Sequence, residues 1–318
     1  MDAAFHQLLD HLSDGQVHSG EALAHELGIS RTAIWKRIQG LRELGLEITA
    51  VSGEGYRLTQ SIQRLDIARI RDRLDDPALS VEVRALVDSS NACLNRERAD
   101  HPPPRALIAE AQSQGRGRRG RTWVSPPGAG LYLSLSWPFE SGLLGLSSLS
   151  LVTGLTVAQV LNQHGLEAVG VKWPNDLVVG QEKLGGCLIE ISGSAEGPCE
   201  AIAGVGLNCS LGQNPAIDQP WTDLERQGLK PDHDALCADL ITALSAAYAR
   251  LDQQGFEPYS LIWDRLDALR GRRVRIDRGN SLPLEGTARG VDAQGRLRLY
   301  TDEGLETIAN GEASVRAV

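Results

Sequence analysis

Seven strand-like runs between residues 80 and 210 constrain the fold more than any other feature of the sequence. The runs are 81–86, 106–111, 131–137, 169–174, 177–179, 187–192 and 201–208. One long helix pattern, residues 146–165, interrupts them, and helix patterns at 232–255 and 258–267 follow. This arrangement predicts a mixed α/β sheet covered by helices. The chain has 318 residues, which is enough for further domains beside this one.

The first 60 residues have the pattern of a helix-turn-helix followed by a hairpin. The helix patterns and strand-like runs are residues 3–12, 19–28, 31–44, 46–51 and 56–59. Ala24, Gly28 and Ile34 have the spacing of two touching helices with a glycine in their turn. The side chains expected to contact phosphates and base edges are Arg31, Thr32, Trp35, Lys36 and Gln39. The pattern predicts a DNA-binding winged helix, with a small protein-interaction module as the alternative.

After Gly271 the pattern becomes entirely β. The strand-like runs are 272–278, 284–293, 295–301 and 305–310. Turn glycines at roughly 8–12-residue intervals between them indicate a small barrel, and we expect it to be SH3-like. The chain is therefore predicted to be an α+β multidomain protein. Its expected domains are a winged helix-turn-helix at 1–62, a mixed α/β domain at 63–270 and an SH3-like β-barrel at 271–318.

Composition limits the compartment and the kind of partner. The net charge of −9 means that any contact with nucleic acid must be local rather than spread over the surface. The five cysteines form no C-x-x-C pair, which favours reduced thiols over disulfides or a zinc site. The N-terminus lacks a signal-peptide pattern, and no apolar run approaches the ~20 residues of a membrane span. We therefore expect a cytoplasmic protein without a membrane partner.

Residues 114–123, QGRGRRGRTW, superficially fit two phosphate-binding motifs. Gly115, Gly117 and Gly120 have the spacing of a dinucleotide site, and Arg121 stands where a P-loop requires lysine. Both motifs need a helix directly after the glycines, but prolines, glycines and a strand-like run follow Trp123. Two interpretations remain. One is a loop that binds an anion through arginines and backbone N–H groups, and the other is a solvated basic loop.

Four other polar stretches are expected at loops or strand ends of the same sheet. Residues 172–176 (KWPND) combine a cation, an amide and a carboxylate, which suits a nucleotide with Mg²⁺. Residues 183–186 (KLGG) place a lysine before two glycines, and 204–208 (GVGLN) would let a ligand approach the backbone closely. Residues 88–91 (DSSN) form a polar cluster. Each alone reads as an ordinary turn, but together they indicate a binding site.

These motifs, in this order, closely resemble those of the bifunctional biotin protein ligase and biotin operon repressor family. The matching stretches are 115–121, 172–176, 183–186 and 204–208. The resemblance extends over essentially the whole chain, including the winged helix and the small β domain. It implies a class II synthetase-like biotin/lipoate ligase fold. It also implies that biotin and ATP form biotinyl-5'-adenylate, from which biotin passes to a lysine of a carrier protein.

The resemblance also implies roles for particular residues. Lys183 and Arg118 are the expected catalytic residues, Lys183 at the reacting junction of carboxylate and phosphate and Arg118 in retaining the adenylate. Asp176 is expected near the Mg²⁺ that accompanies ATP. The residues implied for biotin are Ser89, Ser90, Asn91, Gln112, Gly115, Arg116, Gly117, Arg118, Lys183, Gly186 and Gly204. Those implied for ATP and the adenylate are Arg116, Arg118, Arg121, Trp123, Lys172, Asn175, Asp176, Lys183, Asn208 and Trp221.

The implied partners are the biotin carboxyl carrier protein of acetyl-CoA carboxylase and biotin operator DNA. The adenylate-bound chain is expected to bind the operator as a homodimer, with the adenylate as corepressor. The alternative for regulation is a ligase whose winged helix no longer represses, since Trp35 is unusual on a recognition helix. A lipoate-type ligase shares the catalytic fold, but the arginine run and the KWPND stretch favour biotin.

Three further positions affect how a ligand is held. Ser90 stands where the family often has threonine, and Cys187 stands where an aliphatic residue is usual. Residues 211–222 are polar with two prolines, so we expect a mobile loop there. In the family a loop at this place closes over the adenylate, and Trp221 is the candidate lid residue, with a plain connector as the alternative.

Overall fold

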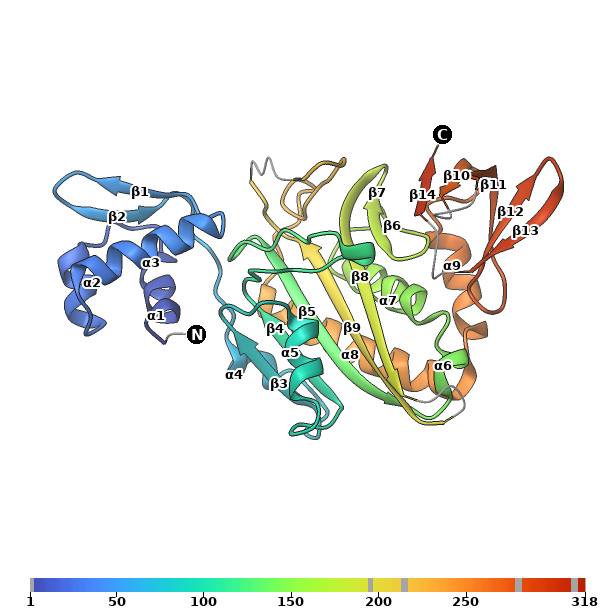
Figure 1. Ribbon diagram of the computed structural model, residues 1–318, viewed down its shortest axis with the longest axis horizontal. Helices are drawn as coiled ribbons and strands as arrows, with labels where there is room; N and C mark the ends of the chain where they lie inside the picture. Colours follow the sequence, from blue (N-terminus) through green and yellow to red (C-terminus); the bar gives the residue numbers. More distant parts are fainter. Residues whose placement is uncertain (1–2, 194–196, 213–216, 278–281, 310–313, 318) are drawn as a thin grey trace.

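Three structural units follow one another along the chain and lie side by side in an elongated molecule (Figure 1). The computed structural model describes residues 3–193, 197–212, 217–277, 282–309 and 314–317. The N-terminal unit lies at one end, the large sheet in the middle and the small β unit at the other end. Within the described residues, no helix combines the length and apolar content needed to cross a membrane.

The N-terminal unit is the predicted winged helix. Its elements are α1 (Ala3–Leu12), α2 (Gly20–Glu26), α3 (Arg31–Glu43), β1 (Ile48–Val51) and β2 (Gly55–Leu58). The Ser30 side chain caps α3 by accepting from the N–H of Ala33, and Ser19 caps α2 in the same way. Ile34 and Ile38 on α3 are fully buried against leucines of α1. The unit therefore has its own core.

In the described part of the chain, the central sheet has seven strands in the order β3-β4-β5-β9-β8-β7-β6. The strands are β3 (Ser80–Arg84), β4 (Arg105–Ala109), β5 (Gly130–Phe139), β6 (Val169–Lys172), β7 (Asp176–Val179), β8 (Glu182–Gly193) and β9 (Cys199–Asn208). Strands β3 and β4 are parallel and the other neighbours are antiparallel. The mixed sheet predicted from the strand-like runs is confirmed.

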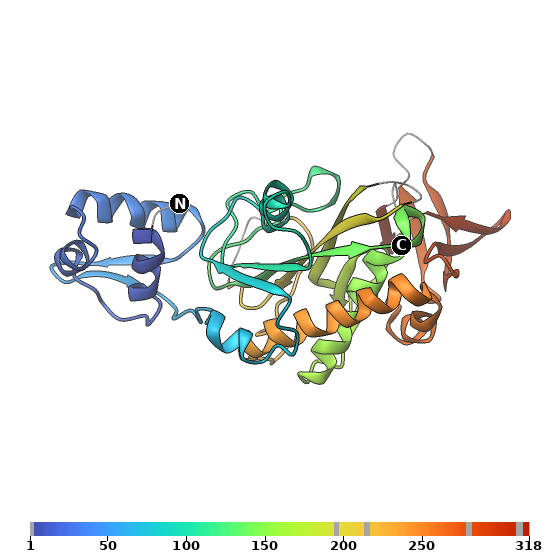
Figure 2. The same ribbon diagram turned by 90° about the horizontal axis from the view of Figure 1, so that it is seen from below.

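Helices cover both faces of this sheet. The α-helices here are α4 (Ile67–Arg71), α5 (Ser90–Glu97), α6 (Gly142–Gly145), α7 (Leu149–Gln163), α8 (His233–Gln254) and α9 (Ser260–Leu266). The 3-10 turns are η1 (Arg118–Gly120) and η2 (Glu257–Tyr259). Helix α8 lies below the sheet in Figure 2 and α5 lies above it. The main core lies between the sheet and the α7–α8 pair, where Trp173 and Tyr248 are fully buried.

The small β unit is antiparallel throughout its described strands. They are β10 (Arg273–Asp277), β11 (Leu284–Val291), β12 (Leu297–Thr301), β13 (Gly304–Ile308) and β14 (Ser314–Ala317), in the order β13-β12-β11-β10-β14. Burial alternates along β12, so one face forms a core and the other is exposed. The indole Nε1 of Trp173 donates to the carbonyl of Gly295 at 3.1 Å. This bond ties the small unit to the central sheet.

Two of the predicted site stretches have a conformation different from the one expected from the sequence. Residues 90–97 form helix α5, although the polar stretch 88–91 was expected to be a loop. The KLGG stretch lies inside β8, although it was expected to precede the strand. Both differences arise because short or glycine-rich segments carry little periodicity, while tertiary packing decides their conformation. Of the expected loop 211–222, residues 213–216 lie outside the described part of the chain.

Candidate functional site

The basic loop folds back on itself as a tight hairpin-like turn. The N–H of Gly117 donates to the carbonyl of Arg121 at 2.7 Å, and the N–H of Trp123 donates to the carbonyl of Gly115 at 2.8 Å. Arg119, at the tip, has a φ of 58°, so the turn passes through the left-handed region. A Cβ on Gly115 would come within 2.3 Å of the Trp123 carbonyl oxygen, so glycine is needed there. No helix follows directly in the described chain, which confirms that this is not a P-loop or a dinucleotide motif.

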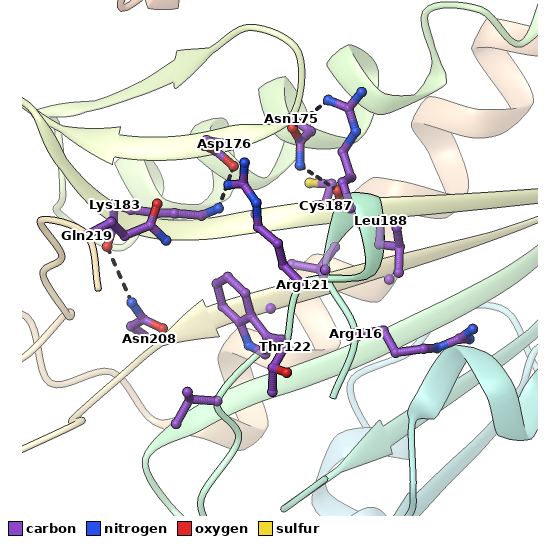
Figure 3. Close-up of a pocket in the computed structure, with 18 of the residues that line it drawn as sticks. Arg116, Arg121, Thr122, Asn175, Asp176, Lys183, Cys187, Leu188, Asn208 and Gln219 are labelled. Atoms are coloured by element: carbon purple, nitrogen blue, oxygen red, sulfur yellow. Dashed lines mark hydrogen bonds and ion pairs between the residues drawn. The ribbon is translucent and has the colours of Figure 1, made fainter. Parts of the chain in front are cut away.

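The predicted motifs converge on one cavity of about 840 Å³. It lies between the basic loop, the start of α5, the β6–β7 hairpin, and strands β8 and β9 (Figure 3). The predicted residues that line it are Ser89, Ser90, Asn91, Gln112, Arg116, Gly117, Arg118, Arg121, Trp123, Lys172, Asn175, Asp176, Lys183, Gly186, Gly204, Asn208 and Trp221. Gly115 does not line the cavity, because its position beneath Trp123 makes it a structural residue of the loop.

One end of the cavity is a network of neutral polar groups. The Ser134 hydroxyl lies 2.7 Å from Ser90 Oγ and 2.6 Å from Asn91 Oδ1. Gln112 Oε1 accepts from the N–H of Ser90 at 2.9 Å, while its Nε2 donates to Ser125 Oγ at the same distance. These side chains are held in fixed orientations by one another. This end can therefore recognise a small neutral ligand group that both donates and accepts hydrogen bonds.

Two glycines on β9, Gly204 and Gly206, leave the space that the Asn91 and Trp123 side chains occupy. A Cβ on Gly204 would lie 2.5 Å from Asn91 Oδ1, and a Cβ on Gly206 would lie 2.5 Å from Trp123 Cε2. Both distances are shorter than van der Waals contact, so any larger residue would displace the side chain above it. The glycines thus allow Asn91 and Trp123 to lie flat on the sheet.

The other end of the cavity is cationic. The Nζ of Lys183 lies 2.6 Å from Asp176 Oδ1 and 5.4 Å from the centre of the Trp123 ring. The Lys183 backbone is fixed by hydrogen bonds with Pro220 and Thr222. Figure 3 shows Lys183 and Asp176 extending toward each other from adjacent strands. This geometry directs the ammonium group into the cavity.

Arg118 enters the cavity from the loop. Its guanidinium donates to Asn175 Oδ1 at 3.0 Å, and the Asn175 amide in turn donates to the Cys187 carbonyl at 2.9 Å. Burial lowers the pKa of Arg118, and the neighbouring Arg119 and Arg121 lower it further. Burial likewise raises the pKa of the Cys187 thiol to about 12, so this thiol, which belongs to the main core, stays neutral. A half-buried guanidinium among other cations favours an anionic ligand.

Asn208 and Trp221 close the side of the cavity next to Lys183. Asn208 Nδ2 donates to the backbone carbonyls of Thr222 at 2.9 Å and Lys183 at 3.3 Å. The amide nitrogen is therefore occupied by the protein backbone. The Arg226 guanidinium lies 3.8 Å from the centre of the Trp221 ring, a close cation–π contact. The Trp221 indole is thus held by Arg226 at the cavity wall.

Sequence reasoning missed two residues that support this site, Ser134 and Glu190. Ser134 is fully buried in the middle of β5, and Glu190 Oε2 accepts from Asn91 Nδ2 at 2.9 Å and lies 3.0 Å from an Arg116 nitrogen. The alternation LYLSLSW places Ser134 on the face opposite the leucines, together with Tyr132 and Ser136, which is a usable signal. Glu190 carries no comparable signal, because its partners are distant in the sequence.

The candidate DNA-binding residues lie on α3, far from the cavity in sequence. Arg31, Thr32, Trp35 and Lys36 are exposed, and Gln39 is half-buried. The Trp35 side chain is 52% exposed, so it does not belong to the core of this unit. The helix thus presents the predicted polar face to solvent.

The described residues contain no group of three or more histidine, cysteine or acidic side chains that could hold a metal ion. Two carboxylates line the cavity, Asp218 and Asp176, which lies beside Lys183. One carboxylate can still contact a Mg²⁺ ion that is bound mainly by phosphates. The donor set therefore fits a metal that arrives with a nucleotide, rather than a resident ion.

Family models match all three units. The Biotin/lipoate A/B protein ligase family matches residues 84–208, an HTH domain matches 6–57, and the Biotin protein ligase C terminal domain matches 270–316. These matches agree with the expected order of units along the chain.

Whole-chain relatives give the same result. The chain is 40% identical over 312 residues to the bifunctional ligase/repressor BirA of Salmonella typhimurium, covering 98% of this chain and 97% of that protein. It is 39% identical to the protein of the same name from Escherichia coli, with 98% and 97% covered. Among solved structures, the biotin protein ligase of Aquifex aeolicus in complex with biotin and ATP has a TM-score of 0.65 at 26% identity. The match covers 75% of this chain and 99% of the Aquifex aeolicus chain.

Proposed function

The chain belongs to the family of bifunctional biotin protein ligases and repressors, and on this premise we propose how its cavity performs the reaction. The protein is an ATP-dependent ligase that forms biotinyl-5'-adenylate and transfers biotin to a lysine of a protein. The observation that carries this function is the convergence of the basic loop, the 172–176 hairpin and Lys183 on one cavity of about 840 Å³.

Biotin's ureido ring binds at the neutral polar end. The ring has one carbonyl acceptor and two N–H donors, and Ser89, Ser90, Asn91 and Gln112 offer both hydrogen-bond donors and acceptors there. Gly204 has no side chain that would displace Asn91. In this orientation the valeryl carboxylate extends toward Lys183, with Gly117 and Gly186 along its path.

The cationic end brings two anions together. Biotin's carboxylate and the triphosphate repel each other, and Arg118, Arg121 and Lys183 line this part of the cavity to offset that repulsion, while Arg116 adds positive charge from the polar end. A carboxylate oxygen attacks the α-phosphorus, the bond to the β-phosphate oxygen breaks, and pyrophosphate leaves. Lys183 stabilises the charge that develops at this junction. Mg²⁺ enters with ATP as its substrate complex and neutralises phosphate charge near Asp176.

The nucleotide lies over Trp123, with Lys172, Asn175, Asn208 and Trp221 around it. Arg118 retains the adenylate after pyrophosphate leaves. The acceptor lysine's amine then attacks the acyl carbon, and AMP departs with the bonding electrons of the mixed anhydride. Because the anhydride is already activated, this step needs no nucleophile from the protein. The proposed acceptor is the biotin carboxyl carrier protein of acetyl-CoA carboxylase.

Biotin-dependent pyrophosphate release from MgATP by the full chain tests the first step. Transfer of labelled biotin to the carrier protein tests the second. Lipoate serves as the comparison substrate, because the lipoate ligases share the family model. Release of pyrophosphate with lipoate at the rate seen with biotin would refute the assigned substrate.

The regulatory function is repression of a biotin operon. The adenylate-loaded chain dimerises and binds operator DNA through Arg31, Thr32, Trp35, Lys36 and Gln39 on α3. A gel shift on biotin operator DNA, with and without biotin and MgATP, tests this function. Removal of residues 1–62 should abolish the shift. Binding that persists after the deletion would refute the role of α3, and no binding by the intact chain would leave a ligase without a repressor.

A further inference from the structure

Three segments of the central unit meet at one carboxylate, that of Glu190 on β8. Its Oε2 accepts from Asn91 Nδ2 of α5 at 2.9 Å and lies 3.0 Å from an Arg116 terminal nitrogen of the basic loop. Arg116 also donates through Nε to Ser89 Oγ at 3.4 Å. The carboxylate therefore joins the loop to the polar end of the cavity by direct contacts.

Glu190 belongs to the row of residues that forms the cavity floor. Side chains two apart on a strand share a face, so Gly186, Leu188 and Glu190 point the same way, and the first two line the cavity. Figure 3 shows Leu188 and Arg116 toward one end of the pocket, away from Asp176 and Lys183. Glu190 is thus the next residue on the same face of β8, just beyond the polar end of the cavity.

Stability alone does not account for this contact. The Arg116 and Glu190 side chains are 43% and 37% exposed, and an ion pair that exposed contributes little to folding. The contact instead fixes the positions of the side chains that it joins. Asn91 Oδ1 accepts from Ser134 at 2.6 Å, and Asn91 Nδ2 donates both to the Leu188 carbonyl at 3.2 Å and to Glu190 Oε2 at 2.9 Å. Glu190 is the shorter of the two acceptors that fix the orientation of the amide nitrogen, and the one that also contacts the basic loop.

We propose that Glu190 is a positioning residue that fastens the basic loop to the biotin end of the site. One carboxylate orients the Asn91 amide and anchors Arg116, so correct seating of Asn91 and closure of the loop depend on each other. The inference deepens the proposed function and rests on it. Loss of the carboxylate frees the loop, so both biotin and the adenylate leave faster.

The test compares Glu190→Gln, Arg116→Gln and the double variant with the unaltered chain. Each is assayed for biotin KM and kcat in pyrophosphate release, and for escape of preformed adenylate into solution without an acceptor. Glu200→Gln is the matched control, because Glu200 lies on the neighbouring strand β9 and bonds Ser136 outside the cavity. Melting temperatures show whether each variant is folded.

For Glu190→Gln we expect biotin KM and the adenylate escape rate to rise about three- to fivefold, the scale of a half-exposed ion pair. The kcat at saturating biotin should change less than either. The double variant should release adenylate no faster than Arg116→Gln alone, because both changes break the same Arg116–Glu190 contact that holds the loop. Glu200→Gln should match the unaltered chain.

Adenylate escape from Glu190→Gln at the rate of Glu200→Gln would overturn the inference. If the fold-changes in escape rate of the two single variants multiply fully in the double variant, the inference is also overturned, because Glu190 would then not act through Arg116. An unaltered chain without biotin-dependent pyrophosphate release would refute the proposed function, and this inference with it. An active chain with unchanged escape refutes the inference alone.

Discussion

Replacing Lys183 with alanine should separate catalysis from folding. The Lys183 side chain is 17% exposed, and its Nζ lies 2.6 Å from Asp176 Oδ1. Truncation removes this ion pair but keeps the backbone hydrogen bonds to Pro220 and Thr222, which do not involve the side chain. We therefore expect a loss of about 1–2 kcal/mol in the free energy of unfolding, from the partly buried Asp176 left unpaired.

The expected loss in rate is far larger. A fixed donor at the position of developing charge contributes roughly 10²–10³ in rate, or about 3–4 kcal/mol in the activation barrier. Biotin-dependent pyrophosphate release in single turnover measures it directly, and a thermal melt measures stability beside it. Lys230→Ala is the matched control, because Lys230 pairs with Glu225 on the surface and its side chain is 75% exposed. Pyrophosphate release by Lys183→Ala within tenfold of the unaltered chain would refute the assigned role.

Three further changes test other parts of the site and the fold. Arg118→Gly should still form the adenylate but release it, giving biotinylation of bystander proteins; a variant that labels its carrier alone would show that Arg118 does not retain the intermediate. Gly206→Ala should lose adenylate formation and about 1–3 kcal/mol of stability, because its Cβ would lie 2.5 Å from Trp123 Cε2; unchanged activity would mean that the indole can move aside freely. Burial raises the pKa of Asp267 from 3.8 to about 6, so the folded chain binds an extra proton between these values and loses stability as the pH rises through them. Asp267→Asn removes this loss and should gain at most about 3 kcal/mol above pH 6 and little at pH 4, measured by denaturant unfolding at both pH values; an equal gain at both would contradict it.

Predicted site residues that are close in the sequence line the same cavity. The stretches 115–121, 172–176 and 183–186 each combine charge with glycine or proline within a few positions, and the cavity contains residues of all three. The strand pattern also predicted the mixed sheet that brings them together. Gly115 was expected among the biotin-binding residues but does not line the cavity, since a glycine required for close backbone packing has the same sequence signature as one beside a ligand.

The sequence by itself determined the three units, the sheet and the chemistry of the loop, because periodicity and turn residues are local properties. Only the tertiary structure decided that residues 90–97 form a helix over the sheet, and that Ser134 lies beneath Ser90 and Asn91. It also decided that Glu190 joins Asn91 to Arg116. Each of these contacts joins residues from 43 to 99 positions apart, and only the strand register and helix packing bring such distant side chains within hydrogen-bonding distance.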